Sequence, residues 1–341
     1  MNMPSHADQL MRTALAMVAP GKGILAADES TPTIGKRFAT IGVESTPENR
    51  QFYRETLFTT PGADAFISGV ILFDETLRQF CADGTPFPKY LADRGILPGI
   101  KVDLGLSPLL GAVEESWTMG LDTLADRLAE YRNLGARFAK WRAVFHIGDH
   151  RPSHLAVEVN SHGLARYASI CQAVGLVPIV EPEILINGSH DLESARRVSQ
   201  WVLSKVFDQL LRHRVILEGI ILKPSMVTPG LDCPNPVPVE DVAQVTVGVF
   251  KRVVPAAVPG IAFLSGGQTS IQATEHLNAM NQISDLPWRL SFSYGRALQE
   301  DALAAWQGIP ANRETAQQVF YHRARCNGAA TAGTYTPDMD A

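Results

Sequence analysis

Short apolar runs recur along the chain, each followed by a longer stretch with helical features. Eight of these runs are expected to be strands: residues 23–28, 69–74, 100–104, 138–144, 176–183, 219–224, 261–265 and 290–294. Their apolarity is continuous rather than alternating, which is typical of parallel strands buried on both faces. Successive runs begin 29 to 46 residues apart, which leaves room for one helix in each interval. The pattern therefore predicts repeated strand-then-helix units.

Residues that favour helix ends mark where the intervening helices begin and stop. Thr46-Pro47 predicts one N-terminus, Asp122 predicts a second, and Asp191 predicts the start of a long helix with apolar residues at helical spacing. Gly135 and Gly175 stand where two helices should end, because glycine tolerates the left-handed backbone of a C-terminal cap.

Eight such units without a long linker predict a single-domain α/β fold, a closed (β/α)8 TIM barrel over residues 1–327. An open doubly wound sheet is the alternative. That fold normally has a glycine-rich phosphate turn after its first strand, whereas Gly21-Lys22-Gly23 precedes the strand here. Residues 328–341 show no apolar periodicity, so we expect a flexible, mobile C-terminal tail there.

Composition and charge narrow the classes of function. The chain has 341 residues, of which 45% are hydrophobic and 19% charged, and its net charge is −5. These values are typical of a globular protein with a large core. No block of basic residues and no apolar run of about 18 residues occurs, so neither nucleic acid nor a membrane is an expected partner. The first residues lack a secretory signal, which favours the cytoplasm.

The cysteines and histidines give little support to a metal site. No C-x-x-C pair occurs among the four cysteines, which are Cys81, Cys171, Cys233 and Cys326. His146 and His150 are four residues apart, but Gly148 lies between them and indicates a loop. We therefore expect no bound metal and no cofactor.

Charged and polar side chains gather where the predicted strands end. They are Asp28, Lys101, Asp103, Lys140, Arg142, Glu181, Glu183, Lys223, Ser265 and Arg296. In a TIM barrel the C-terminal ends of the strands carry the active site. Three pairs have members two residues apart: Lys101 and Asp103, Lys140 and Arg142, and Glu181 and Glu183. Both members of a pair therefore lie on the same face of their strand, and this face points into the lumen if either residue acts in the active site. A structural ion pair or a strand tip in water remains an alternative for any single residue, but the whole set favours a reactive site.

Lys223 closes the apolar run 219–224. Burial of an ammonium group is costly and generally lowers the pKa of a lysine. The result is a nucleophilic amine of the kind that forms Schiff bases with ketones. Lys101 and Lys140 are the other two candidates for such an amine.

Two loops have features of a phosphate site. Ser265-Gly266-Gly267-Gln268 directly follows the seventh run, and Tyr294-Gly295-Arg296 follows the eighth. Glycines let backbone N–H groups approach an anion, and arginine supplies a forked positive charge. Loops after the seventh and eighth strands are a common phosphate site in TIM barrels.

Stretches in order along nearly the whole chain resemble the class I fructose-bisphosphate aldolases, metal-independent enzymes that form a Schiff base. The matching stretches are residues 21–30, 69–73, 99–103, 138–142, 180–185, 222–224, 226–230, 263–268 and 292–298. The resemblance implies a cytoplasmic, homotetrameric TIM-barrel lyase without a cofactor. Its reaction would be reversible cleavage of a sugar bisphosphate, fructose 1,6-bisphosphate, to two triose phosphates, dihydroxyacetone phosphate and glyceraldehyde 3-phosphate.

The resemblance also implies roles for the residues at the strand ends. Lys223 matches the lysine that attacks the C2 ketone. Glu181 matches the acid–base residue for carbinolamine formation and dehydration, with Glu183 beside it and Lys140 holding charge. Asp28 matches the residue that receives, or organises the transfer of, the C4-hydroxyl proton.

Two groups of residues match the phosphate sites of the family. The dihydroxyacetone-phosphate end is matched by Ser265, Gly266, Gly267, Ser293, Gly295 and Arg296. The opposite end is matched by Ser30, Arg37, Lys101 and Arg142. Two fixed phosphate sites on either side of the amine would position a doubly anionic substrate with its ketone within reach.

Two departures from the family pattern affect these expectations. Pro32-Thr33 stands where the animal-type pattern has Gly-Ser, so the loop at the second phosphate differs in stiffness and in its hydroxyl. Familiar members end in a longer tail that finishes with a tyrosine, whereas this chain stops at Ala341, and Tyr335 matches an ordinary tail position. We expect cleavage to persist with the protonation step at C3 altered.

Three other functions are considered. The same chemistry could act mainly on sedoheptulose 1,7-bisphosphate or fructose 1-phosphate, because discrimination lies in contacts to the distal hydroxyls and phosphate. A sugar-phosphate-binding protein without turnover is disfavoured by the presence of all the reactive residues. A metal-dependent aldolase is disfavoured by the histidine pattern.

Overall fold

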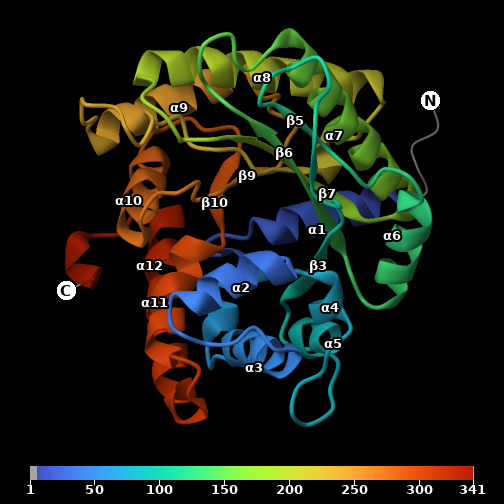
Figure 1. Ribbon diagram of the computed structural model, residues 1–341, viewed down its shortest axis with the longest axis vertical. Coiled ribbons are helices and arrows are strands. Elements are labelled where there is room, and N and C mark those ends of the chain that lie inside the picture. The colour runs from blue at the N-terminus through green and yellow to red at the C-terminus, as the bar shows by residue number, and fades with distance from the viewer. Residues whose placement is uncertain (1–5, 341) are drawn as a thin grey trace.

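The computed structural model describes residues 6–340 of the chain. A closed barrel of parallel strands forms its centre, in the order β1-β10-β9-β8-β7-β6-β3-β2 around the ring (Figure 1). The barrel strands are β1 (Gly23–Ala27), β2 (Ile67–Leu72), β3 (Leu97–Lys101), β6 (Phe138–Phe145), β7 (Val177–Ile184), β8 (Ile221–Leu222), β9 (Gly260–Phe263) and β10 (Arg289–Tyr294). Each predicted run contributes one strand, so the predicted (β/α)8 barrel is confirmed and the open doubly wound sheet is excluded.

Strand β8 is much shorter than the apolar run that predicted it. The segment before it forms a short 3-10 helix, η2 (Leu217–Gly219), and only Ile221 and Leu222 have regular strand pairing. The backbone N–H of Lys223 still donates to the carbonyl of Val180 in β7 at 2.8 Å. Lys223 is therefore held in line with the sheet although the regular strand stops one residue earlier.

Helices surround the barrel and follow the strands along the chain (Figure 1). They are α2 (Thr31–Ala39), α3 (Pro47–Phe58), α4 (Asp74–Leu77), α5 (Phe87–Ala92), α6 (Leu124–Asn133), α7 (His154–Val174), α8 (Leu192–Arg212), α9 (Val239–Val253), α10 (Ser270–Asn281), α11 (Arg296–Trp306) and α12 (Arg313–Thr331). Within residues 6–340, no helix combines the length and apolarity needed to cross a membrane.

Most of the predicted helix ends are found. Thr46 and Asp191 cap α3 and α8, because their side-chain oxygens accept from backbone N–H groups three residues later. Gly175 ends α7 with a left-handed backbone at φ 85°. The helix expected at Asp122 begins later, at Leu124, because Thr123 also has a left-handed backbone, which cannot belong to a helix.

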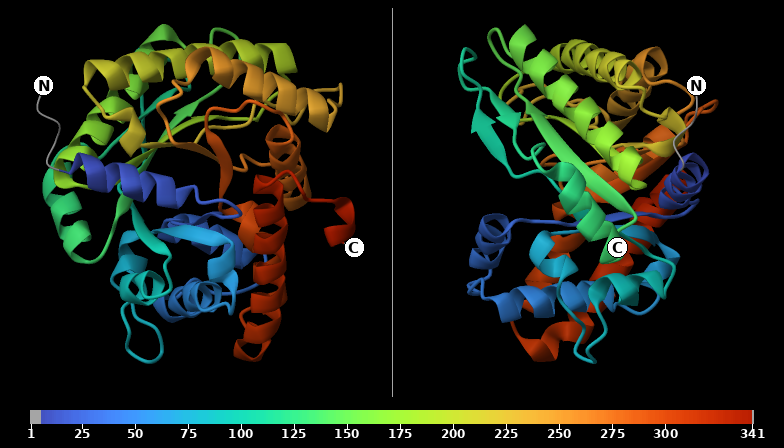
Figure 2. Two further views of the ribbon diagram at one scale, coloured as in Figure 1. Left: turned by 180° about the vertical axis from the view of Figure 1, so that it is seen from behind. Right: turned by 90° about the vertical axis from the view of Figure 1, so that its right-hand side faces the viewer.

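Helix α1 (Ala7–Met17) lies outside the strand-then-helix pattern and closes the N-terminal end of the barrel. Its buried residues Leu10, Ala14 and Met17 share one apolar cluster with inward-facing strand residues. Ser68 at the start of β2 also donates its hydroxyl to the Met17 carbonyl at 2.6 Å. In Figure 2 (left) the helix crosses in front of the strands.

A small hairpin was also not predicted from the sequence. Strands β4 (Leu106–Pro108) and β5 (Ser116–Thr118) pair in antiparallel fashion between β3 and α6. Each has only three residues, which is too short for an alternation of polar and apolar positions to be recognised. The hairpin tip is apolar and exposed, with Leu110 91% and Val113 85% accessible.

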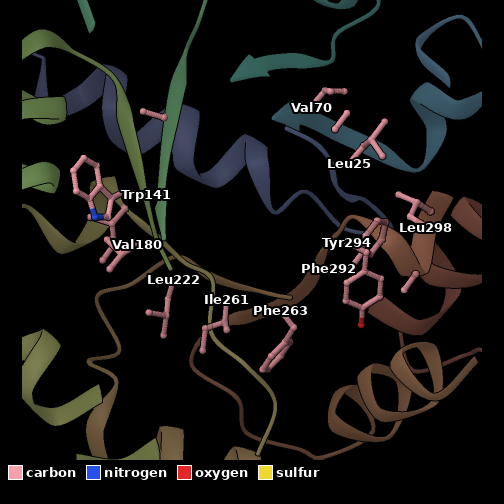
Figure 3. Packing of buried hydrophobic residues seen from close by; sticks show 14 of the residues in the cluster. Leu25, Val70, Trp141, Val180, Leu222, Ile261, Phe263, Phe292, Tyr294 and Leu298 are labelled. Carbon is pink, nitrogen blue, oxygen red and sulfur yellow. The ribbon is translucent and has the colours of Figure 1, made fainter. Parts of the chain in front are cut away.

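The barrel strands are apolar on both faces because each face meets a different core. Outward residues such as Val180, Leu222 and Phe263 pack against the helices in the larger core cluster (Figure 3). Inward residues such as Ile179 and Ile221 belong to a smaller cluster that fills the lumen with α1. Side chains of a strand alternate between the two faces, so each strand contributes to both cores.

The segment expected to form a mobile tail begins inside a helix. Helix α12 runs on to Thr331, past the predicted boundary at Asn327, which is fully buried. Tyr335 is only 4% exposed, and its backbone N–H donates to the side chain of Asn278 at 2.9 Å. The lack of apolar periodicity was a poor guide here, because small residues such as Ala330 pack closely without such a pattern. Mobility of residues 328–341 stays a prediction.

One aromatic ring fills the lumen where the strand backbones carry glycine. Phe138 is fully buried at the start of β6, and its ring lies against Gly69 and Gly99 of the two preceding barrel strands. A Cβ atom on Gly69 would lie 3.1 Å from Cε1 of this ring. Glycine at these positions leaves the space that the ring occupies.

We predict that Phe138→Ala lowers the free energy of unfolding by about 3–5 kcal/mol, because a rigid closed barrel cannot collapse into the cavity that the mutation leaves. Urea unfolding of the variant and the wild type measures the change. Phe80→Ala is the matched control: Phe80 is 49% exposed, so its loss should change stability by about 0.5 kcal/mol or less. Equal effects of the two mutations would contradict this role for the Phe138 ring.

Candidate active site

A cavity of about 980 Å³ opens at the C-terminal ends of the barrel strands. Every site residue expected from the sequence lines it: Asp28, Ser30, Arg37, Lys101, Lys140, Arg142, Glu181, Glu183, Lys223, Ser265, Gly266, Gly267, Ser293, Gly295 and Arg296. These residues come from seven of the eight strands or from the segments that directly follow them. The structure thus brings together all fifteen residues.

The alternation of each strand explains why charged residues reach the lumen. Ile179 and Ile221 point inward, so the next inward positions on their strands are Glu181 and Lys223. Phe138 is likewise followed by Lys140 two residues later. The lumen is therefore apolar near α1 and becomes charged toward the cavity.

Four buried side chains form a row of alternating charge at the base of the cavity. Glu181 bridges two lysines, with its Oε1 3.4 Å from Lys223 Nζ and its Oε2 3.0 Å from Lys140 Nζ. Lys140 Nζ is also 2.9 Å from Asp28 Oδ2. All four residues are at most 9% exposed. Burial of so many charges is tolerated because each has a partner of opposite sign.

The row shifts the pKa of two of its members. Burial alone would raise the pKa of Asp28, but the positive charges of Lys140 and Lys223 outweigh it and hold that pKa well below the usual value. Burial alone would lower the pKa of Lys140, but the negative charges of Asp28 and Glu181 raise it well above the usual value. Asp28 and Lys140 are therefore both ionised across the physiological range of pH.

Two further pairs lie beside this row, nearer to solvent. Lys101 is the strand neighbour of Lys140 and pairs instead with Asp103, Nζ to Oδ1 at 2.7 Å. Arg142 forms an ion pair with Glu183 across β6 and β7. Asp103 is a strand-end residue for which the sequence predicts no role in the site, and it both pairs with Lys101 and lines the cavity.

The loops after β9 and β10 form one side of the cavity. Gly266 and Gly267 have left-handed backbones at φ 54° and 92°. A Cβ on Gly267 would also lie 2.8 Å from Ile186, so this tight turn requires glycine. Ser293 is 1% exposed, and its hydroxyl has no hydrogen-bond partner among residues 6–340. An unpaired buried hydroxyl at a cavity wall is available to a ligand.

Gln268 and His276 support this loop and were not predicted as site residues. The Gln268 carboxamide donates to the Ser265 carbonyl at 2.9 Å and closes the turn. Its oxygen lies 2.5 Å from His276 Nδ1. Burial lowers the pKa of His276 to about 4, so the ring is neutral near pH 7 and its Nδ1–H donates to Gln268. Gln268 could have been recognised from the sequence, because it lies within the stretch 263–268 that resembles the family. His276 lies outside every such stretch, so no sequence feature pointed to it.

Glu29 anchors a second network that sequence reasoning missed. Its Oε1 accepts from Arg37 and, at 3.0 Å, from the side chain of Gln299. Its Oε2 is 2.5 Å from Nη2 of the buried Arg54. The signal was its position directly after Asp28 in the stretch 21–30, but its partners lie on three different helices, α2, α3 and α11, and Gln299 is 270 residues away. The network fixes Arg37 against α11.

The residues expected at the opposite phosphate end come from three places: Ser30 and Arg37 from the start and body of α2, Lys101 from the end of β3 and Arg142 from β6. Ser30 and Thr33 share a hydrogen bond between their hydroxyls at 3.0 Å at the start of α2. Thr33 thus supplies a hydroxyl where the sequence departs from the family pattern, but this segment is the first turn of α2 and not the expected loop. Arg37 Nη2 lies 3.6 Å from where a Cβ on Gly295 would be, so it adjoins the loops of the first phosphate end.

Comparisons with known proteins agree on one family. The family model described as "Glycolytic: Fructose-bisphosphate aldolase class-I" matches residues 9–341. "Probable fructose-bisphosphate aldolase class 1" of Xylella fastidiosa (strain 9a5c) is 56% identical over 329 residues, which cover 96% of this chain and 98% of the relative. "Fructose-bisphosphate aldolase 5, cytosolic" of Arabidopsis thaliana is 55% identical and covers 97% of this chain and 92% of its own length. The solved structure of fructose-bisphosphate aldolase from Plasmodium falciparum, in complex with TRAP and a small-molecule inhibitor, matches with a TM-score of 0.97, 50% identity and 98% coverage of each chain.

We predict that Asp28 makes stability depend on pH in acid. Its folded-state pKa lies below the ordinary value of 3.8, so ionised Asp28 stabilises the fold above pH 3.8. That contribution is lost as the pH falls below 3.8 toward the folded-state pKa. Asp28→Asn should be less stable than the wild type at neutral pH but lose less stability on acidification.

Urea unfolding at a series of pH values from neutral to below 3.8 measures this difference. Asp232→Asn, in an exposed loop, is the control and should keep the acid dependence of the wild type. The same acid dependence in Asp28→Asn and the wild type would show that Asp28 gains nothing from its lysine neighbours.

Proposed function

The chain belongs to the class-I fructose-bisphosphate aldolase family, and we propose that Lys223 is the amine that carries its reaction. The observation that supports this choice is the pairing of the three lysines in the cavity. Lys140 lies within 3.0 Å of two carboxylates, and Lys101 is 2.7 Å from one. Lys223 has a single carboxylate neighbour, Glu181, at 3.4 Å. Of the three, Lys223 lies farthest from its nearest carboxylate.

The raised pKa of Lys140 also supports Lys223 as the nucleophile, because it disfavours Lys140 in that role. Its proton is held by Asp28 and Glu181, so its nitrogen lone pair is not free to attack a ketone. A permanently charged Lys140 instead stabilises negative charge on the two carboxylates beside it. We therefore assign Lys140 an electrostatic role rather than a nucleophilic one.

In the proposed reaction, Lys223, Glu181 and Asp28 act one after another. The neutral amine of Lys223 attacks C2 of fructose 1,6-bisphosphate, and Glu181 donates the proton with which the C2 oxygen leaves as water. In the resulting iminium, the C3–C4 bonding electrons move toward nitrogen while Asp28 receives the C4-hydroxyl proton. Glyceraldehyde 3-phosphate leaves, and protonation at C3 followed by hydrolysis releases dihydroxyacetone phosphate. Glu181, Lys140 and Asp28 are a coupled set, so proton assignments belong to the set as a whole.

The two ends of the cavity suit the two phosphates of this substrate. We propose that Ser265, Gly266, Gly267, Ser293, Gly295 and Arg296 hold the phosphate on C1. The left-handed glycine turn and the unpaired Ser293 hydroxyl support this assignment. We propose Ser30, Arg37, Lys101 and Arg142 for the other phosphate. Arg37 also adjoins the first group through Gly295, and Glu183 holds Arg142 in place.

The cellular setting is proposed from the relatives. Relatives from Arabidopsis thaliana that are named cytosolic support a cytoplasmic enzyme. A homotetramer is proposed from the family resemblance. Sugar phosphates are the substrates of the family, and fructose 1,6-bisphosphate is the proposed main substrate here.

Borohydride reduction in the presence of dihydroxyacetone phosphate should attach the sugar to Lys223, because only this lysine is free to form the Schiff base. Mass mapping of the digested protein identifies the modified peptide. Lys223→Met should remain folded and lose both trapping and cleavage. Lys251→Met, an exposed lysine at the end of α9, should retain both. An adduct on Lys101 or Lys140 would falsify the assignment.

A comparison of two substrates that differ by one phosphate can distinguish the roles of the two proposed phosphate sites. Arg296→Ala should raise KM by roughly 10- to 100-fold for both fructose 1,6-bisphosphate and fructose 1-phosphate, since both carry the C1 phosphate and lose one charged hydrogen bond. Lys101→Met should raise KM for the bisphosphate alone. Steady-state kinetics on both substrates give the ratio of the two kcat/KM values. A ratio unchanged by Lys101→Met would contradict its role at the second phosphate.

A further inference from the structure

Three side chains of different chemistry converge far from the barrel mouth, where α12 meets the C-terminal segment. His322 and Cys326 are one turn apart on α12, and Asp340 ends the short helix η4 (Pro337–Asp340). The segment that carries Asp340 lies beside α12 at the edge of the molecule (Figure 2, left). None of the three lines the substrate cavity. Within residues 6–340, this is the one cluster of three or more potential metal ligands.

The spacing of the three ligand atoms fits a tetrahedral metal ion. His322 Nε2 lies 3.1 Å from Asp340 Oδ1, while Cys326 Sγ lies 3.7 Å from His322 Nε2 and 3.6 Å from Asp340 Oδ1. Zinc binds sulfur at about 2.3 Å and nitrogen or oxygen at about 2.0–2.2 Å. At the tetrahedral angle, such ligands are therefore about 3.3–3.6 Å apart. All three separations are within a few tenths of an ångström of that range.

Neighbouring residues hold the carboxylate in place. Asp340 Oδ2 accepts from the Tyr335 hydroxyl at 2.7 Å and from Arg323 Nη1 at 3.0 Å. Arg323 Nη2 also lies 2.9 Å from Oδ1, the oxygen that faces His322 and Cys326. The two bonds to Oδ2 lie on the far side of the ligand oxygen, a common support in metal sites, whereas Arg323 Nη2 shares Oδ1 with a bound ion or is displaced by it. Cys326 is fully buried, whereas the His322 side chain is 41% exposed, which leaves a path from solvent.

We propose that His322, Cys326 and Asp340 form a zinc site, with Nε2, Sγ and Oδ1 as the protein ligands and water as the fourth. Binding replaces the thiol proton of Cys326, which passes to solvent, so a thiolate and a carboxylate balance the charge of the ion. Zinc suits this mixture of sulfur, nitrogen and oxygen donors. The ion joins η4 to α12 and has a structural role that does not depend on the aldolase reaction.

A search of the sequence for paired histidines or paired cysteines does not find this site. Its helical part is a mixed pair, His322-x-x-x-Cys326, and its third ligand follows 14 residues after the cysteine. The fold alone brings them together, because the segment after α12 turns back along the helix.

Cobalt is the probe for the site, since tetrahedral Co²⁺ with a thiolate ligand has a charge-transfer band and visible d–d bands. The full-length protein should bind one equivalent of Co²⁺ with both features, and Zn²⁺ should displace it and remove the colour. Cys326→Ser should lose the charge-transfer band. His322→Gln, at a partly exposed position, should weaken binding of Zn²⁺ by at least about 10-fold, and Tyr335→Phe by about 10- to 100-fold.

Cys233→Ser is the matched cysteine control, because Cys233 lies in a loop away from α12, and it should keep the full cobalt spectrum. Cleavage of fructose 1,6-bisphosphate checks that each variant is folded, since none of these residues lines the cavity. A wild-type protein without the thiolate band would overturn the proposal. So would metal affinities that are equal in the wild type, Cys326→Ser and His322→Gln, because the three side chains would then form only a hydrogen-bonded cluster.

Discussion

In a closed barrel of parallel strands, each side chain must point either to the helices or into the lumen, and the rest of this structure depends on that constraint. It explains why the strands are apolar along their whole length. It also explains why a lysine or a glutamate two residues beyond an inward isoleucine must enter the same interior. The apolar packing near α1 therefore determines where the charges are located. A shift of one strand by a single residue would turn its charged side chain toward the helices.

The charges that enter the lumen are tolerable only as a set. Lys140 is held by two carboxylates, and one of these, Glu181, also contacts Lys223. Removal of one member leaves a buried charge without its partner, which is far more costly than removal of a neutral pair. The same arrangement distinguishes the lysines chemically. Lys140 is paired with two carboxylates, whereas Lys223 has one, at 3.4 Å. On the proposed assignment, the same distribution of charge determines both the stability of the site and which lysine reacts.

Much of the fold and the cavity lining could be predicted because the relevant signals are local. Each strand is a continuous apolar run, and the four charged residues at the base of the cavity lie within these runs: Asp28, Lys140, Glu181 and Lys223. What could not be predicted depends on contacts between distant segments. Glu29 is next to Asp28, yet its role follows from Arg54 and from Gln299, which lies 270 residues away. Helix α1 closes the barrel end without any repeat to reveal it, and the packing of α12 beyond Asn327 relies on small residues that give no periodic signal.

Helix α1 and the ring of Phe138 close the N-terminal end of the barrel, and this has a consequence for the order of events in a reaction cycle. With that end filled, substrates and products use the same opening at the C-terminal end. On the proposed assignment the ketone fragment is tethered to Lys223 at the base of the cavity, while the aldehyde fragment has no covalent bond to the protein. The aldehyde must then depart first, and in the synthetic direction the ketone must enter first. On this assignment, a barrel that is closed at one end and carries its reactive lysine at the base of the cavity enforces a compulsory order of exchange.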